Sequence, residues 1–200
     1  MATNEEITRH EDIDPDDDPP WVGGPPPTEP IAVVAYDPAW PAVFEVLAGR
    51  LRDALGDGVL GLEHVGSTSV PGLDAKPVID IDLTVADSTD EAAYVPALER
   101  IGFVLRIREP SWHQHRCFEG DDPRANLHVW SPDSPEAIRH RMFRDWLRDH
   151  PEDRDRYAEV KRTSAAASNA EGESMLAYNQ RKQPVIRDIL DRMFRAHGML

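Results

Sequence analysis

The chain has 200 residues, enough for one domain with a substantial core, and a formal net charge of −15 at pH 7. An acidic chain without a basic stripe argues against binding to a long nucleic acid, because phosphate neutralisation supplies most of that affinity. Cys117 is the single cysteine, so an intramolecular disulfide is excluded. No apolar run reaches the length of a membrane span or of a signal-peptide core. We therefore expect a cytoplasmic protein without a membrane partner.

Residues 1–30 hold nine acidic residues against one arginine, and a proline-rich run follows the acids. Such a composition cannot bury enough apolar area to offset the entropy of ordering it. We therefore predict a disordered acidic tail over residues 1–30. An arm that binds a partner through Trp21 and the polyproline run stays open as an alternative.

Residues 31–65 begin with a short apolar run that predicts a strand or an extended lead-in. Asp37 followed by Pro38 predicts the start of a helix, and Gly56 predicts its end. Between them, apolar residues recur at helical spacing, which indicates a helix with one core-facing side. A strand is expected over 59–65.

The later elements alternate between strand and helix signals. After the strand at 77–85, we predict a helix from about 90 to 101, strands at 103–107, 115–119 and 125–130, and helices from 134, at 152–168 and at 173–196. The order predicts an α+β or α/β fold with a mixed sheet. We assign 31–132 to the sheet core and 133–200 to a helical C-terminal part.

A turn of small, hydroxyl-bearing residues precedes the strand at 77–85. Gly66, Ser67, Thr68 and Ser69 would let backbone N–H groups and hydroxyls approach an anion closely. On the following strand, Asp80 and Asp82 share one face, because side chains alternate along a strand. Two carboxylates one pleat apart repel unless a divalent cation lies between them, so this pair predicts a Mg²⁺ site.

The Gly-Ser turn followed by Asp-x-Asp resembles the signature of the nucleotidyltransferase fold, which includes polymerase-β-like enzymes. The longer string is more specific. His64-Val-Gly-Ser-Thr-Ser-Val-Pro-Gly-Leu followed by Lys76-Pro-Val-Ile-Asp80-Ile-Asp82 resembles the GrpB family, and the resemblance covers about residues 31–195. It implies a nucleotidyltransferase-like mixed sheet flanked by helices.

The resemblance implies less about the reaction than about this architecture. From the Gly-Ser turn and the carboxylate pair, our first hypothesis is a Mg²⁺-dependent nucleotidyltransferase-like enzyme that uses ATP or another nucleoside triphosphate to nucleotidylate or activate a small-molecule acceptor. The expected third carboxylate is replaced by a histidine, His128, which weakens the two-metal form of the mechanism. The proposed catalytic groups are Asp80, Asp82 and His128. The proposed phosphate ligands are Gly66, Ser67, Thr68, Ser69, Lys76, Arg116 and Lys182. The proposed substrate contacts are His64, His115, Arg106 and Tyr178.

Three other functions stay open. The chain could be a non-catalytic nucleotide or metabolite binder of the same fold, or an ATP-dependent ligase that forms an adenylylated intermediate. A zinc site among His64, His113, His115 and His128 is conceivable, although their spacing matches no closed structural zinc motif. We interpret Cys117 as buried and inert, and the sequence leaves a homodimer open. No Walker phosphate loop occurs.

Overall fold

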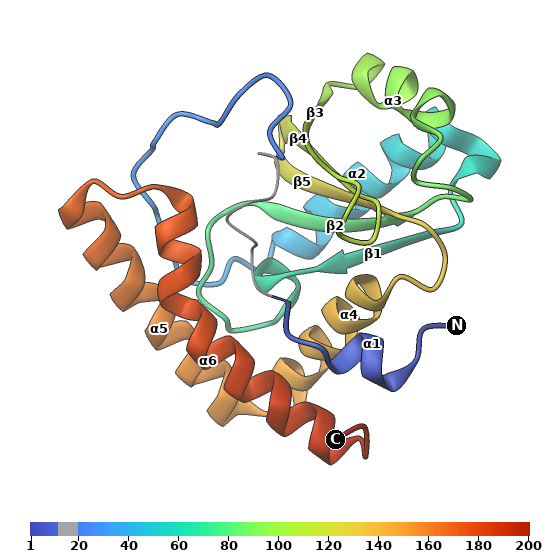
Figure 1. Ribbon diagram of the computed structural model, residues 1–200. Helices are drawn as coiled ribbons and strands as arrows, with labels where there is room; N and C mark the ends of the chain where they lie inside the picture. Colours follow the sequence, from blue (N-terminus) through green and yellow to red (C-terminus); the bar gives the residue numbers. More distant parts are fainter. Residues whose placement is uncertain (12–19) are drawn as a thin grey trace.

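The computed structural model describes residues 1–11 and 20–200. Its centre is a five-stranded sheet in the order β1-β2-β5-β4-β3 (Figure 1). Strands β2 and β5 are parallel and the other neighbouring pairs are antiparallel, which confirms the mixed sheet. The strands are β1 (Gly61–Val65), β2 (Ile79–Thr84), β3 (Phe103–Glu109), β4 (His115–Asp121) and β5 (Arg124–Trp130).

One face of the sheet is apolar and packs on helices α2 (Trp40–Leu55) and α3 (Glu91–Arg100). Alternation along β2 points Ile79, Ile81 and Leu83 to this side, where Phe118 of β4 and Leu127 of β5 join them, all at most 2% exposed. Full burial of each such side chain is worth about 1.5–3 kcal/mol, so this layer forms the main core.

The C-terminal part contains α4 (Pro135–Asp149), α5 (Pro151–Glu171) and α6 (Met175–Ala196), and α6 runs on through Pro184. Figure 1 shows α5 and α6 side by side, away from α2 and α3. Val70 and Leu73, which follow the Gly-Ser turn, pack with Leu147, Tyr157 and Ile189 of these helices. The helical part is therefore anchored on the same turn that precedes β2, and the predicted α+β class with a helical C-terminal part is confirmed.

The N-terminal segment differs from the expected disordered tail where it is described. Helix α1 (Asn4–Thr8) begins with a capping box between Thr3 and Glu6, and Ile7 is buried among apolar side chains of α6. Arg139 of α4 donates hydrogen bonds to the backbone oxygens of Ile7 and Arg9. The burial of Ile7 and the hydrogen bonds from Arg139 thus hold this segment on the helical part, which the composition did not suggest. The prediction for residues 12–19 lies outside the described residues.

Smaller differences concern element ends. Helix α2 begins at Trp40, because Asp37 forms a turn before it and its Oδ1 accepts from the N–H of Ala39 at 2.8 Å. The apolar run at 31–36 makes a single bridge, Val34 with Ala75, and forms no longer strand. Among the described helices, none is both long enough and apolar enough to cross a bilayer.

Candidate functional site

The second face of the sheet carries polar side chains and is the face from which Asp80 and Asp82 project. Their partners across the parallel pair of strands are Asn126 and His128 of β5. Asn126 Nδ2 donates to Asp80 Oδ1 at 2.8 Å. The predicted carboxylate pair and the histidine in place of a third acid are therefore neighbours.

Gly66 allows the turn before β2 to lie directly against Asp80. Its φ is +66°, and a Cβ at this position would lie 2.2 Å from Asp80 Oδ2. Only glycine fits there, for both conformational and steric reasons. The single 3₁₀ turn Ser67–Ser69 follows, and Arg148 of α4 holds it by donating to the Ser69 backbone oxygen at 2.8 Å.

Asp82 is almost completely buried, at 2% exposure, and is held by two partners. Trp130 Nε1 donates to Oδ1 at 3.0 Å, and His140 Nδ1 lies 3.0 Å from Oδ2. Burial opposes the charged form of Asp82, but the charge and hydrogen bond of His140 keep the pKa of this carboxyl below its usual value. Burial would likewise lower the pKa of His140, yet Asp82 raises it to about 9, so the two form an ion pair at neutral pH.

The chain has three lysines, and all three meet on one side of Asp80. Lys76 and Lys182 approach the Tyr178 ring, with Nζ 6.0 and 4.0 Å from its centroid. Lys161 of α5 lies 5.1 Å from the ring centroid of a second tyrosine, Tyr157, and donates to the Asp74 backbone oxygen at 2.6 Å. We call Lys76, Lys161 and Lys182 the lysine cluster.

The lysine cluster is short of negative charge. Burial, together with the neighbouring ammonium groups, lowers the pKa of Lys161 and of Lys182 to about 7, and burial lowers the pKa of Lys76. The Tyr178 hydroxyl is buried and has no hydrogen-bond partner among the described residues. An anion with several acceptor oxygens would satisfy these groups together.

A row of histidines continues the polar face toward β4. Glu109 Oε2 lies 2.7 Å from His115 Nδ1, and His115 Nε2 lies 3.0 Å from His128 Nδ1. Burial lowers the pKa of His115 to about 3 and that of His128 to about 4, so both imidazoles are neutral at pH 7. The His115 ring stacks on Trp130 with centroids 4.3 Å apart.

Some predicted ligands lie elsewhere. His64 points to the apolar face, where its ring stacks on Phe44 at 4.8 Å and its Nε2 lies 3.0 Å from the Thr68 hydroxyl. The Thr68 hydroxyl is thus occupied by a contact with His64 on the apolar face. The Ser69 hydroxyl donates to the Gly66 backbone oxygen at 2.6 Å. Neither hydroxyl is directed at an anion.

The two predicted arginines are also occupied. Arg116 lies on the opposite side of β4 from its neighbours His115 and Cys117, and its Nε donates to Glu91 of α3 at 2.6 Å. Strand alternation accounts for this, because adjacent residues face opposite ways. Arg106 pairs with Glu119 at 3.1 Å on the edge strand β3, at a register irregularity.

Among the residues named from the sequence, Lys76, Lys182 and Tyr178 lie together near Asp80, against which Gly66 packs. Ser67 lies within hydrogen-bond reach of Tyr157. Sequence reasoning missed three further groups: Lys161, His140 and Glu109. His140 stands among surface-type arginines of α4, and no local pattern marks it. Lys161 does carry a signal, since lysine is rare in a chain that otherwise uses arginine.

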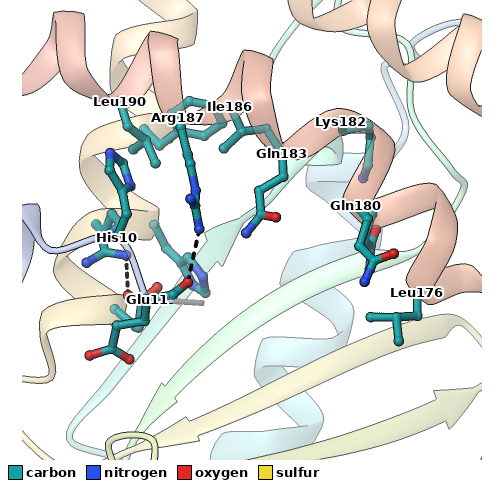
Figure 2. Close-up of a pocket in the computed structure, with 14 residues that line it drawn as sticks. His10, Glu11, Leu176, Gln180, Lys182, Gln183, Ile186, Arg187 and Leu190 are labelled. Carbon is teal, nitrogen blue, oxygen red and sulfur yellow. Dashed lines mark hydrogen bonds and ion pairs between the residues drawn. The ribbon is translucent and has the colours of Figure 1, made fainter. Parts of the chain in front are cut away.

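A pocket of about 320 Å³ lies beside the lysine cluster, between α4, α6 and the segment after α1. His140 and Lys182 line it and thus connect it to the polar face. Figure 2 shows Gln180 and Gln183 of α6 on one side of this pocket, and His10 and Glu11 near its other end. Its wall combines apolar and amide side chains with ionisable ones such as Glu136, Arg139 and Lys182, which suits a small polar molecule.

The carboxylates fit a hard cation in part. Mg²⁺ prefers carboxylate oxygens, and Asp80 and Asp82 are two such groups one pleat apart. Both oxygens of Asp82, however, lie within hydrogen-bond distance of His140. An ion at this pair would therefore require His140 to release Asp82.

Comparison with known proteins agrees with this architecture. The model of the family described as GrpB protein matches residues 30–192. A UPF0157 protein of Halalkalibacterium halodurans is 50% identical over 81% of this chain and 82% of its own length. The crystal structure of the conserved protein GrpB from Enterococcus faecalis superposes with a TM-score of 0.68 at 29% identity, covering 82% of this chain and 99% of that one.

A further relative is longer. A dephospho-CoA kinase of Mycolicibacterium paratuberculosis is 34% identical, and the match covers 82% of this chain but 46% of that protein. The shared region is thus less than half of the kinase. With the family model matching more than three quarters of its residues, the chain belongs to the GrpB family.

Proposed function

We propose that this chain binds a nucleoside triphosphate through the lysine cluster and, with Mg²⁺, transfers its nucleotidyl group to a small-molecule acceptor. The observation that supports this proposal is the convergence of every lysine in the chain on Asp80, beside the Gly66 turn. Asp80 is the carboxylate that acts on all three ammonium groups, so when all are protonated the cluster carries more positive charge than Asp80 alone offsets.

The low pKa of Lys161 and Lys182, about 7 in each, supports a polyanionic ligand. Isolated ammonium groups are costly to bury, and like charges add to the cost. A triphosphate would reverse both effects, because its oxygens neutralise and hydrogen-bond the ammonium groups. Strongly shifted groups gathered in one place are typical of a binding or catalytic site.

The reaction would be an in-line displacement at the α-phosphorus. An acceptor hydroxyl or amine forms the new bond to the α-phosphorus and gives up its proton to water. The bond from that phosphorus to the oxygen that bridges it to the β-phosphate breaks, and pyrophosphate leaves with this oxygen. Lys76, Lys161 and Lys182 would hold the β- and γ-phosphates and offset the charge that develops on them. Mg²⁺, held by Asp80 and Asp82, would supply further charge neutralisation at the phosphates.

The 320 Å³ pocket is the proposed place for the acceptor. Lys182 connects the pocket to the proposed phosphate site, because it belongs to the lysine cluster and also lines the pocket. His140 lies between the pocket, which it lines, and Asp82, which it contacts. The amides of Gln180 and Gln183 would orient a small polar acceptor. A long nucleic acid is a poor fit, because the chain carries a net charge of −15.

The similarity to a dephospho-CoA kinase is compatible with a nucleotide-using function. This chain has no glycine-rich Walker loop, so it would bind phosphates with lysines and the Gly66 turn instead.

A second candidate function is binding without transfer. The observation that favours it is that His128 stands opposite Asp82 while His140 occupies the Asp82 carboxylate. Both features reduce the number of oxygen ligands that are available to a pair of metal ions. In this alternative the lysine cluster holds a nucleotide or another phosphorylated metabolite, and no pyrophosphate is released.

Calorimetric titration with ATP, GTP, CTP and UTP, each with and without Mg²⁺, tests the proposal. We expect Lys161→Met and Lys182→Met to weaken triphosphate binding at least about tenfold, the loss of one charged hydrogen-bond partner. Arg181→Met is the matched control, because Arg181 adjoins Lys182 but pairs at the surface with Glu171 and Glu173.

The outcomes separate the candidates. Mg²⁺-dependent binding that the Asp80→Asn/Asp82→Asn double variant loses, with pyrophosphate release on addition of an acceptor, supports transfer. Metal-independent binding that needs the lysines but releases no pyrophosphate supports the binding function. Absence of binding for all four triphosphates would overturn the transfer proposal and would leave the binding function only with a phosphorylated ligand other than a triphosphate.

A further inference from the structure

The polar face holds a second group of ligand-type side chains, next to the carboxylates but distinct from them. We propose that His115, Cys117 and His128 bind a transition-metal ion, with Zn²⁺ as the best match to their chemistry. This site differs from the zinc site considered from sequence, because it excludes His64 and includes the cysteine. It does not depend on the proposed nucleotide chemistry.

The three ligand atoms are already close together. One ligand atom from each of His115, Cys117 and His128 lies within 4.8 Å of the others. His115 Nε2 and His128 Nδ1 are 3.0 Å apart. Tetrahedral zinc, with bonds of about 2.0–2.1 Å to nitrogen and about 2.3 Å to sulfur, places two nitrogen ligands roughly 3.3 Å apart and nitrogen and sulfur roughly 3.6 Å apart. Small shifts of the rings and of the Cys117 side chain would therefore admit the ion.

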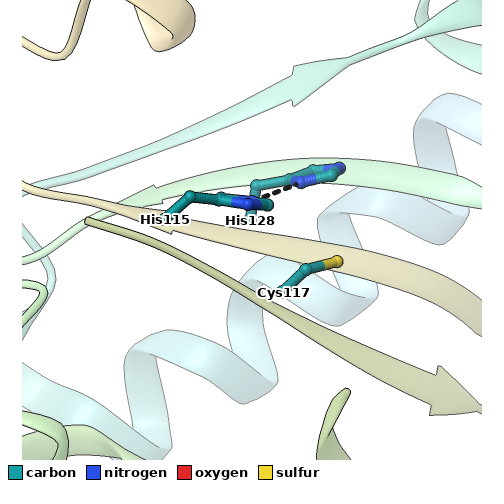
Figure 3. A group of neighbouring side chains, drawn as sticks. All are labelled: His115, Cys117 and His128. Carbon is teal, nitrogen blue, oxygen red and sulfur yellow. Dashed lines mark hydrogen bonds between the residues drawn. The ribbon is translucent and has the colours of Figure 1, made fainter. Parts of the chain in front are cut away.

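The strands provide this arrangement. Cys117 and His128 are direct partners in the β4–β5 register, and His115 lies two residues before Cys117 on the same face. Figure 3 shows the three side chains on neighbouring strands, with the two imidazoles directed at each other. The ligands come from two separate strands, so their spacing along the chain forms no recognisable zinc motif.

A carboxylate supports the first histidine. Glu109 Oε2 lies 2.7 Å from His115 Nδ1, and this leaves Nε2 as the nitrogen directed at the other ligands. A carboxylate on the far nitrogen is the usual partner of a metal-bound histidine, because it fixes the ring and its tautomer. Stacking on Trp130 holds the same ring from its face.

The ligand types suit a soft cation. Imidazole binds metal in its neutral form and cysteine binds it as the thiolate. Burial raises the pKa of the Cys117 thiol, so without a cation it stays protonated and unreactive. A bound metal would displace this proton and leave the thiolate as a ligand.

Within the described residues, the group supplies three protein ligands and no fourth. Three ligands with one open position are typical of catalytic zinc sites, whereas structural zinc sites are closed by four. The fourth position would be taken by water or by a group of a substrate. The proposed ion would therefore add a Lewis-acid site to the polar face.

Cobalt titration of the chelator-treated full chain, without nucleotide, tests the site. We expect about one Co²⁺ per chain, with the visible bands of tetrahedral cobalt and an absorption that reports a thiolate bound to the metal. Cys117→Ser should remove the thiolate absorption and weaken binding at least about tenfold, and His128→Gln should abolish the tetrahedral bands. Glu109→Gln should weaken binding about 10–100-fold and keep the thiolate absorption.

Two controls make the result specific. His113→Gln changes a nearby histidine outside the group, and the Asp80→Asn/Asp82→Asn double variant changes the carboxylates; neither should alter the absorption of the thiolate-bound cobalt. Thermal melting checks that each variant folds, and Cys117→Ser decides the matter should the histidine variants fail to fold. No cobalt binding, or binding unchanged by Cys117→Ser, would overturn the proposal.

Discussion

The two faces of the sheet are built from the same strands but differ in almost every physical property. On β4, Phe118 points to the apolar face and is fully buried there, whereas its neighbour Cys117 points to the polar face beside His128. The apolar face is held to the helices by many similar hydrophobic contacts. The polar face depends on particular pairs, such as Asp82 with His140. Stability should therefore be concentrated on one face and chemistry on the other.

The largest expected effect tests this division on neighbouring residues. Phe118→Ala should lower the free energy of unfolding by about 3–5 kcal/mol, because it leaves a cavity in the main core. Cys117→Ala, one residue away, should cost about 1 kcal/mol. Urea denaturation measures both. Equal losses would mean that the polar face contributes to the core as much as the apolar face.

Gly66→Ala should give the next largest effect. Its φ of +66° and the 2.2 Å approach of a Cβ to Asp80 Oδ2 both oppose a side chain. We expect a loss of about 1–3 kcal/mol in stability and weaker triphosphate binding. Gly102→Ala is the control, because Gly102 has a φ of +89° but no atom within 4 Å of the added carbon. Equal effects would show that the Asp80 contact is unimportant.

The pH dependence of stability should differ between a histidine of each face. The pKa of His140 rises on folding from 6.5 to about 9, so its contribution is complete below pH 6.5 and disappears as the pH rises to 9. It should amount to about 1–2 kcal/mol, since the side chain is 31% exposed. His140→Gln should remove this alkaline loss in chelator-containing buffer.

His64, on the apolar face, should act in the opposite direction. Its pKa falls on folding from 6.5 to about 4, so its contribution is complete above pH 6.5 and disappears toward pH 4. Denaturation midpoints of His64→Gln and the parent chain across this range measure the difference. A matching alkaline effect in His64→Gln would contradict the distinction between the faces.

The smallest effect on stability is expected at the lysine cluster. Lys161→Met and Lys182→Met should leave the free energy of unfolding unchanged or raise it by up to about 1 kcal/mol, because each removes a poorly compensated buried charge. Added triphosphate should raise the melting temperature of the parent chain and not of these variants. A large loss of stability in the absence of ligand would instead assign the lysines a structural role.

Local patterns predicted the elements and the Gly66–Asp80–Asp82 stretch, because the periodicity of a helix or strand and the spacing of a turn are written within a few residues. The joining of α5 and α6 to this stretch was beyond such reasoning. Lys161 and His140 reach the site through packing between elements more than 50 residues apart in sequence. Arg116 could have been excluded from the predicted phosphate ligands on sequence grounds, because adjacent residues of a strand face opposite ways and it therefore cannot share a face with His115.

The distribution of lysine gives the molecule a practical property. Because its side-chain amines occur at Lys76, Lys161 and Lys182, reagents selective for amines can modify little else except the chain terminus. Reductive methylation with isotope-labelled formaldehyde would place its side-chain NMR signals at this one location. An enzyme that acylates lysine side chains would likewise modify this chain only at the lysine cluster.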